Sequence, residues 1–92
     1  MDDINQLRRR IDEVDEQILQ SLSKRAEVCR SIGVLKRKQK IPIKDIPREN
    51  DVYAHVRKKA AALSLDAAQV EAVYRQIVNM CMAVQELEEK RE

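Results

Sequence analysis

A helical pattern of apolar residues occupies the whole N-terminal part of this chain. The residues recur at steps that place them on one side of an α-helix, and they are Ile4, Leu7, Ile11, Val14, Ile18, Leu22, Val28, Ile32 and Leu35. The pattern predicts a helix from about Asp3 to about Gln39, with Asp2 or Asp3 as its N-cap. Gly33 is its one weak position, at a cost of ~1 kcal/mol relative to Ala.

The predicted length of this helix limits what the chain can fold into. At 1.5 Å per residue it is roughly 54 Å long. A compact chain of 92 residues has a radius of gyration of only about 12 Å. A second copy of the chain is the simplest cover for the apolar stripe, so we expect an intertwined, domain-swapped homodimer.

Two further helices follow a break at residues 40–44, where Ile41 precedes Pro42 and is pushed toward extended geometry. Asp45 is the expected N-cap of a second helix that ends near Leu63 and carries Pro47 in its first turn. A third helix is expected to begin at Asp66 and to fray over its charged last turn, residues 86–92. The chain has one Gly, two Pro, no Trp and no Phe, which is typical of all-helical proteins. We therefore predict an all-α, three-helix protomer forming a single domain over residues 1–92.

Charge and cysteine usage exclude several classes of function. The net charge of +2 is too small to indicate a nucleic-acid-binding protein, and no apolar run is long enough to span a membrane. Cys29 and Cys81 lie inside helical patterns without metal-ligand spacing, so we expect reduced thiols in the core of a cytoplasmic protein. Acidic residues directly after Met1 argue against a signal peptide. The absence of a linker before Glu92 favours a free-standing protein over the excised domain of a fusion.

Polar residues interrupt the apolar faces at three places. Arg25 and Lys36 lie on the inner face of the first helix, eleven residues apart, or roughly 16 Å along its axis. Gln85 lies on an apolar face of the third helix, and the turn at residues 45–49 carries Asp45, Arg48 and Glu49. A buried cation is costly unless an anion meets it, so these groups predict a pocket for an anion.

Each of these residues also has a simpler interpretation. Arg25 could form an interface ion pair, Lys36 could be a solvated residue near a helix end, and Asp45 could be only a cap. Gln85 could lie at the surface.

Arg8 lies 17 residues before Arg25, or about 25 Å along the helix, so it can join the same site only from a second subunit.

These residues together carry a family resemblance. Residues 7–15 (LRRRIDEVD), Arg25, Lys36, residues 42–49 (PIKDIPRE) and Gln85 resemble the all-helical (AroQ) class of chorismate mutases. The resemblance covers essentially the whole chain without a gap. It implies a domain-swapped dimer of three-helix protomers that rearranges chorismate to prephenate on the route to phenylalanine and tyrosine.

The resemblance also implies a role for each site residue. Arg8 of one subunit and Arg25 of the other would bind the two substrate carboxylates. Lys36 and Gln85 would be the catalytic donors to the ether oxygen, and Lys36 would also bond a carboxylate. The ring hydroxyl would be held by Glu49, with the backbone at Asp45, and Arg48 would order that end of the site. Cys81 stands where the bacterial pattern has a Ser that contacts a carboxylate, and a thiol is a weaker donor than a hydroxyl.

The expected reaction is a unimolecular pericyclic shift that needs no metal or other cofactor. Catalysis would come from holding a reactive conformer and from stabilising negative charge on the ether oxygen as its C–O bond breaks. Three alternatives stay open at this point. They are a lyase of the same fold acting on isochorismate, a non-catalytic helical dimerisation module, and a nucleic-acid binder using basic residues 8–10 and 36–40, although acidic residues 12–16 interrupt that basic face.

Overall fold

The fold consists of three helices joined by two short connections. A computed structural model of the chain describes residues 3–91, and over them the elements are α1 (Ile4–Gln39), α2 (Ile46–Ala62) and α3 (Ala67–Glu89). The all-α, three-helix prediction is confirmed. No helix among the described residues is long and apolar enough to cross a membrane.

Helix α1 begins and ends where local side-chain chemistry allows. The Asp3 carboxylate accepts a hydrogen bond from the Gln6 N–H at 2.8 Å, and the Gln6 side chain accepts one from the Asp3 N–H at 2.8 Å, which completes a capping box. Asp2, the other candidate cap, lies outside the described residues. The helix ends at Lys40, whose left-handed backbone (φ 57°) turns the chain toward Pro42.

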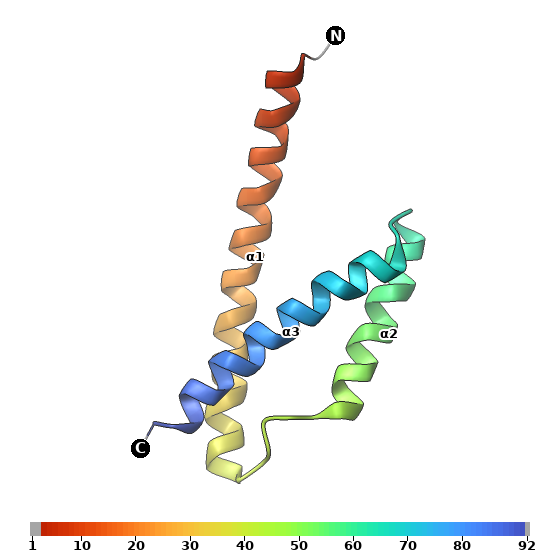
Figure 1. Cartoon of the computed structure of the whole chain (residues 1–92). Coiled ribbons are helices and arrows are strands. Elements are labelled where there is room, and N and C mark those ends of the chain that lie inside the picture. Colours follow the sequence, from red (N-terminus) through yellow and green to blue (C-terminus); the bar gives the residue numbers. More distant parts are fainter. Residues whose placement is uncertain (1–2, 92) are drawn as a thin grey trace.

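Helix α3 packs on both of the other helices, whereas α1 and α2 make no close backbone contact with each other. Figure 1 shows α3 starting beside the C-terminal end of α2 and crossing the C-terminal half of α1, while the N-terminal half of α1 projects beyond both. The molecule is accordingly elongated, with extents of 57 × 26 × 14 Å and a radius of gyration of 16.6 Å. A compact chain of this length would have a radius of about 12 Å.

The apolar core of one protomer is small. Its buried members are Cys29, Tyr53, Val56, Ala60 and Val78. Along the projecting half of α1, Ile4, Ile11 and Ile18 are between 51% and 60% exposed. Within one chain, neither α2 nor α3 covers this stripe of apolar residues on α1.

The first turns of α2 and α3 are capped as predicted. The Asp45 carboxylate accepts from the Arg48 N–H at 3.0 Å, and the Asp66 carboxylate accepts from the Gln69 N–H at 2.9 Å. Pro47 lies in the first turn of α2, where its missing N–H costs nothing. These caps fix where α2 starts and hence where the turn at residues 45–49 lies.

The predicted fraying of residues 86–92 is wrong for residues 86–89, which remain helical. Arg37 of α1 supplies the reason, because its Nη1 donates to the carbonyl oxygens of Glu88 at 2.9 Å and Arg91 at 3.0 Å. A cation on these carbonyls satisfies orphan acceptors and suits the negative end of the helix dipole. The last turn of α3 is therefore held against α1.

An ionic cluster joins α2 to α3. The Glu71 carboxylate of α3 accepts from Arg57 of α2 at 3.1 Å and from Arg75 at 3.0 and 3.1 Å. Hydrogen bonds first from Arg75 and then from Arg57 hold the pKa of Glu71 below its ordinary value. The Arg75 guanidinium also lies 4.3 Å from the centre of the Tyr53 ring, within range of a cation–π contact.

Candidate active site

A hollow of about 410 Å³ opens where the three helices meet. Its size suits a small metabolite. It is lined by Arg25, Val28, Cys29, Ile32, Lys36, Ile43, Asp45, Arg48, Glu49, Val52, Val78, Cys81, Met82 and Gln85. Seven of the eight predicted site residues are in this lining, which confirms that the interrupted apolar faces converge on one cavity.

Arg25 lies on the wall that α1 contributes. Its Nη1 is 3.5 Å from the Ile77 carbonyl oxygen and 3.8 Å from the Cys29 sulfur, and the side chain is half-buried. These contacts are long for hydrogen bonds to a charged donor. The guanidinium therefore keeps most of its capacity for a carboxylate.

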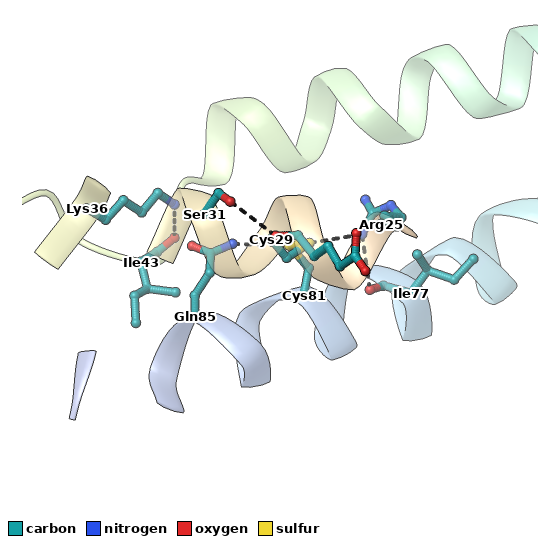
Figure 2. Close-up of a disulfide and its surroundings, with 9 residues drawn as sticks. Arg25, Cys29, Ser31, Lys36, Ile43, Ile77, Cys81 and Gln85 are labelled. Carbon is teal, nitrogen blue, oxygen red and sulfur yellow. Dashed lines mark hydrogen bonds between the residues drawn. A yellow bond between two sulfur atoms is a disulfide. The ribbon is translucent and has the colours of Figure 1, made fainter. Parts of the chain in front are cut away.

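Lys36 lies about three turns further along α1. Its Nζ donates to the Ile43 carbonyl oxygen at 2.8 Å, as Figure 2 shows. This contact ties the end of α1 to the connection that follows it. A lysine ammonium has three donors, so two of them remain available to an anion in the hollow.

The turn at residues 45–49 closes one end of the hollow. Asp45 caps α2, and Arg48 and Glu49 lie in the first turn of that helix. The Glu49 Oε2 is buried and has no hydrogen-bond partner among the described residues. A buried acceptor without a partner is costly, so this oxygen is placed to accept a proton donor from a ligand.

Gln85 lies on the opposite wall, on α3. It is 5% exposed, so the interpretation of Gln85 as a surface residue is wrong. Its Nε2 donates to the Cys81 sulfur at 3.1 Å, while its Oε1 is buried without a partner among the described residues. In the view of Figure 2 the Gln85 side chain, rising from α3, lies between Lys36 of α1 and the disulfide.

The expectation of reduced thiols is contradicted. Cys29 of α1 and Cys81 of α3 form a disulfide, with their Cα atoms 5.4 Å apart. The physical reason is that the face of α1 carrying Arg25 and Cys29 packs directly on the face of α3 carrying Cys81 and Gln85. Cys81 lines the hollow as predicted, but a disulfide sulfur has no proton to donate to a carboxylate.

Arg8 is the one predicted site residue that lies elsewhere. It is exposed on the projecting half of α1 and does not line the hollow. Its separation of 17 residues from Arg25 along one straight helix corresponds to about 25 Å. Within one chain, Arg8 and Arg25 cannot bind the same small molecule.

Gly33 is a site-supporting residue that the sequence pattern did not reveal. A Cβ at this position would lie 3.0 Å from the Gln85 Cα and 3.1 Å from the Glu88 Cβ. The pattern shows Gly33 only as a weak point in a helix, whereas the structure requires it for the close approach of α1 and α3. Its place eight residues after Arg25, on the inner face, is the only signal that could have pointed to this role.

The charges around the hollow favour an anion. Three cations line it, Arg25, Lys36 and Arg48, against two carboxylates, Asp45 and Glu49. Asp45 is already engaged as a helix cap. The arrangement can bind carboxylates at the α1 side and a hydroxyl or ammonium donor at Glu49, with Lys36 and Gln85 facing the space between.

Fold and cavity together define a class: an all-helical protein with a hollow between its helices that has the size and the excess of cations to suit a small anionic metabolite. Within that class the family is established by comparison. Residues 7–86 match the family model for chorismate mutase type II, and the chain belongs to this family.

Similar proteins carry related names. The chain is 30% identical over 88 residues to the bifunctional chorismate mutase/prephenate dehydratase of Aquifex aeolicus, covering 92% of this chain and 24% of that protein. It is 31% identical over 61 residues to the chorismate mutase of Methanocaldococcus jannaschii, covering 66% and 62%. It is 30% identical over 77 residues to the 4-amino-4-deoxychorismate mutase of Streptomyces pristinaespiralis, covering 84% and 60%. The chain thus spans less than two thirds of each of these relatives.

Proposed function

We propose that this chain is a chorismate mutase that rearranges chorismate to prephenate without a cofactor, as a homodimer in which each site takes Arg8 from the partner subunit. The observation that carries the proposal is the hollow itself. It brings together Arg25, Lys36, Glu49 and Gln85, which carry the family resemblance and lie within the matched residues 7–86.

Charge balance supports the contribution of Arg8 across the dimer. The cations and carboxylates that line the hollow in one chain leave a net charge of +1, that is, three minus two. One more arginine would bring this to +2, equal and opposite to the two carboxylates of chorismate. Arginine can bind a carboxylate through two parallel hydrogen bonds, so Arg25 and the second arginine would each take one.

The exposed stripe on α1 supports a dimer. Its residues lie on the part of α1 that α2 and α3 leave uncovered, and Val14 and Ile18 border a second hollow that reaches Arg25. Burying each such side chain contributes about 1.5–3 kcal/mol. A second copy packed antiparallel along this stripe would bring its Arg8 toward Arg25 of this chain, because the stripe runs along α1 between these two positions.

The mechanism uses position and charge alone. Arginines at the two carboxylates hold the enolpyruvyl arm over the ring, which removes rotational freedom before the reaction. Lys36 Nζ and Gln85 Nε2 donate to the ether oxygen, where negative charge grows as the C–O bond breaks. Both donor groups exist before the substrate arrives, although Lys36 Nζ also donates to the Ile43 carbonyl oxygen and Gln85 Nε2 also donates to the Cys81 sulfur.

The environment of Glu49 also suits a second substrate, an amino analogue of chorismate. Its buried, unpartnered oxygen would accept a hydrogen bond from a ring hydroxyl or, with added charge attraction, from a ring ammonium. The latter group is what an amino-deoxy analogue of chorismate carries in place of the hydroxyl.

The compartment is likewise a proposal. We expect a cytoplasmic protein, where disulfides are rare and usually transient or redox-sensing.

Product identification by NMR with purified protein tests the proposal. Chorismate, 4-amino-4-deoxychorismate and isochorismate are supplied separately, with a chelator present. We expect prephenate from chorismate at the highest kcat/KM. Faster turnover of the amino analogue would reassign the substrate, and pyruvate release from isochorismate would favour the lyase. If none of the three compounds is consumed and none raises the melting temperature, the chain would be a non-catalytic dimerisation module.

A further inference from the structure

The Cys29–Cys81 disulfide forms part of the wall of the hollow. It joins α1 to α3 across 52 residues of sequence, and both cysteines line the cavity. Cys29 is 3% exposed, whereas Cys81 is partly exposed. Both cysteines also line a second hollow of only about 30 Å³, so the larger hollow is the wider approach to the bond.

Both sulfurs contact site residues. The Cys81 sulfur accepts from Gln85 Nε2 at 3.1 Å, and the Cys29 sulfur lies 3.8 Å from Arg25 Nη1. Figure 2 shows the disulfide between Arg25 and Gln85. One redox bond thus contacts one proposed carboxylate ligand and one proposed donor to the ether oxygen.

The oxidation state of Cys81 decides whether its sulfur can form a hydrogen bond only with Nε2 of Gln85 or also with Oε1. A disulfide sulfur can only accept a hydrogen bond, so it holds Nε2 and leaves the buried Oε1 without a partner. A thiol can also donate, weakly. After reduction, the Cys81 S–H can donate to Oε1 if the Gln85 side-chain amide flips by 180°. In the flipped amide both N–H groups of Nε2 face the hollow.

We propose that the Cys29–Cys81 disulfide is a redox control of this site, in which reduction by a dithiol frees Gln85 to act as a donor and so raises turnover. The inference rests on the proposed function. A dithiol thiolate attacks the Cys81 sulfur, the S–S bond breaks, and Cys29 leaves as a thiolate that takes up a proton. The second thiol of the reductant then displaces the Cys81 thiolate, which is protonated in turn. The protein gains two electrons and two protons, and the dithiol becomes a cyclic disulfide.

Site occupancy provides an independent readout. Because Cys81 lines the hollow, we expect a ligand that fills the hollow to shield the attacked sulfur. Saturating prephenate, the product, is therefore expected to slow reduction of the disulfide by dithiothreitol severalfold. A disulfide that merely stabilised the fold from outside the site would be reduced at the same rate with or without prephenate.

The deciding experiment compares kcat for chorismate in oxidised and reduced protein, with free thiols counted by mass spectrometry after alkylation. We expect roughly tenfold higher kcat on reduction, below the 10²–10³ lost when such a donor is removed outright, with little change in KM. The Cys29→Ser variant, which cannot form the bond, is expected to match the reduced protein with or without dithiothreitol. Circular dichroism checks that each form is folded.

Several outcomes would overturn the inference. The inference fails if kcat is equal in the two states or falls on reduction. It also fails if two free thiols remain after treatment with oxidised dithiothreitol, or if prephenate does not protect the disulfide. Each of these outcomes leaves the proposed function intact. No chorismate turnover in either state would overturn the proposed function, and this inference with it.

Discussion

Gly33 of α1 and Gln85 of α3 lie so close that a Cβ on the glycine would be crowded against the backbone of α3. A Cβ built on Gly33 would be 3.0 Å from the Gln85 Cα, and a backbone atom cannot move aside as the end of a flexible side chain can. The backbone position of a proposed catalytic donor is thus set by a residue with no side chain.

Gly33→Ala is therefore expected to destabilise the protein and to lower kcat. Alanine improves helix propensity by about 1 kcal/mol, but overpacking costs typically 1–3 kcal/mol, and here α3 must move to relieve it. Urea denaturation and chorismate turnover measure the two effects. Ser31→Ala, at an exposed position two residues earlier, is the control. A more stable and fully active Gly33→Ala variant would show that the two helices can separate at no cost.

Arg37→Ala is expected to release the last turn of α3. Arg37 donates to two carbonyl oxygens at that end, and hydrogen bonds to charged groups contribute about 1.5–3 kcal/mol when shielded from water. Since Arg37 is half-exposed, we expect a loss near 1 kcal/mol. Hydrogen exchange at residues 86–89 should become faster, whereas Lys38→Ala, the exposed neighbour, should leave it unchanged. Equal exchange in both variants would contradict the capping role.

Lys36→Met is expected to lower kcat by about 10²–10³, the effect of removing one donor to a developing oxyanion. Methionine is also unbranched, only one atom shorter than lysine and a good helix former, so helicity should remain. Lys38→Met, at an exposed site two residues on, removes the same charge outside the hollow and should retain activity. If both variants kept wild-type kcat, Lys36 would have no part in the reaction.

Glu71→Gln is expected to weaken the link between α2 and α3 in a pH-dependent way. Because the pKa of Glu71 is lowered in the folded protein, its ionised form contributes stability above the pKa of the unfolded chain. That contribution disappears as pH falls through the lowered pKa. Denaturation midpoints of wild type and variant should therefore differ at neutral pH and converge in acid. A constant difference across this range would show that the carboxylate charge is irrelevant.

Much of the fold could be predicted because its signals are local. The break at residues 40–44 and the caps Asp45 and Asp66 depend on backbone chemistry within a few residues. The helical spacing of Arg25, Lys36 and Gln85 also placed these three side chains on interior faces. The family resemblance then supplied their roles, which the spacing alone left open.

The remaining features depend on which faces of α1 and α3 meet. The Cys29–Cys81 disulfide, the hold of Arg37 on α3 and the close approach at Gly33 each join residues about 50 apart in sequence. Spacing within one helix gives a face but not the register against another helix. Cys29 follows Arg25 by one turn, and Cys81 precedes Gln85 by one turn. If the sequence had indicated that these two faces pack on each other, the disulfide could have been predicted.

Each proposed site is built from two chains, and mixing of subunits tests this assignment. Arg8→Ala and Arg25→Ala, each inactive alone, are unfolded together, refolded and assayed with chorismate. In a mixed dimer one site regains both arginines, so an equal mixture should recover activity in about one quarter of the sites. Refolding each variant alone is the control. If the mixture stayed as inactive as its components while wild-type protein refolded to full activity, the two arginines would not come from different subunits.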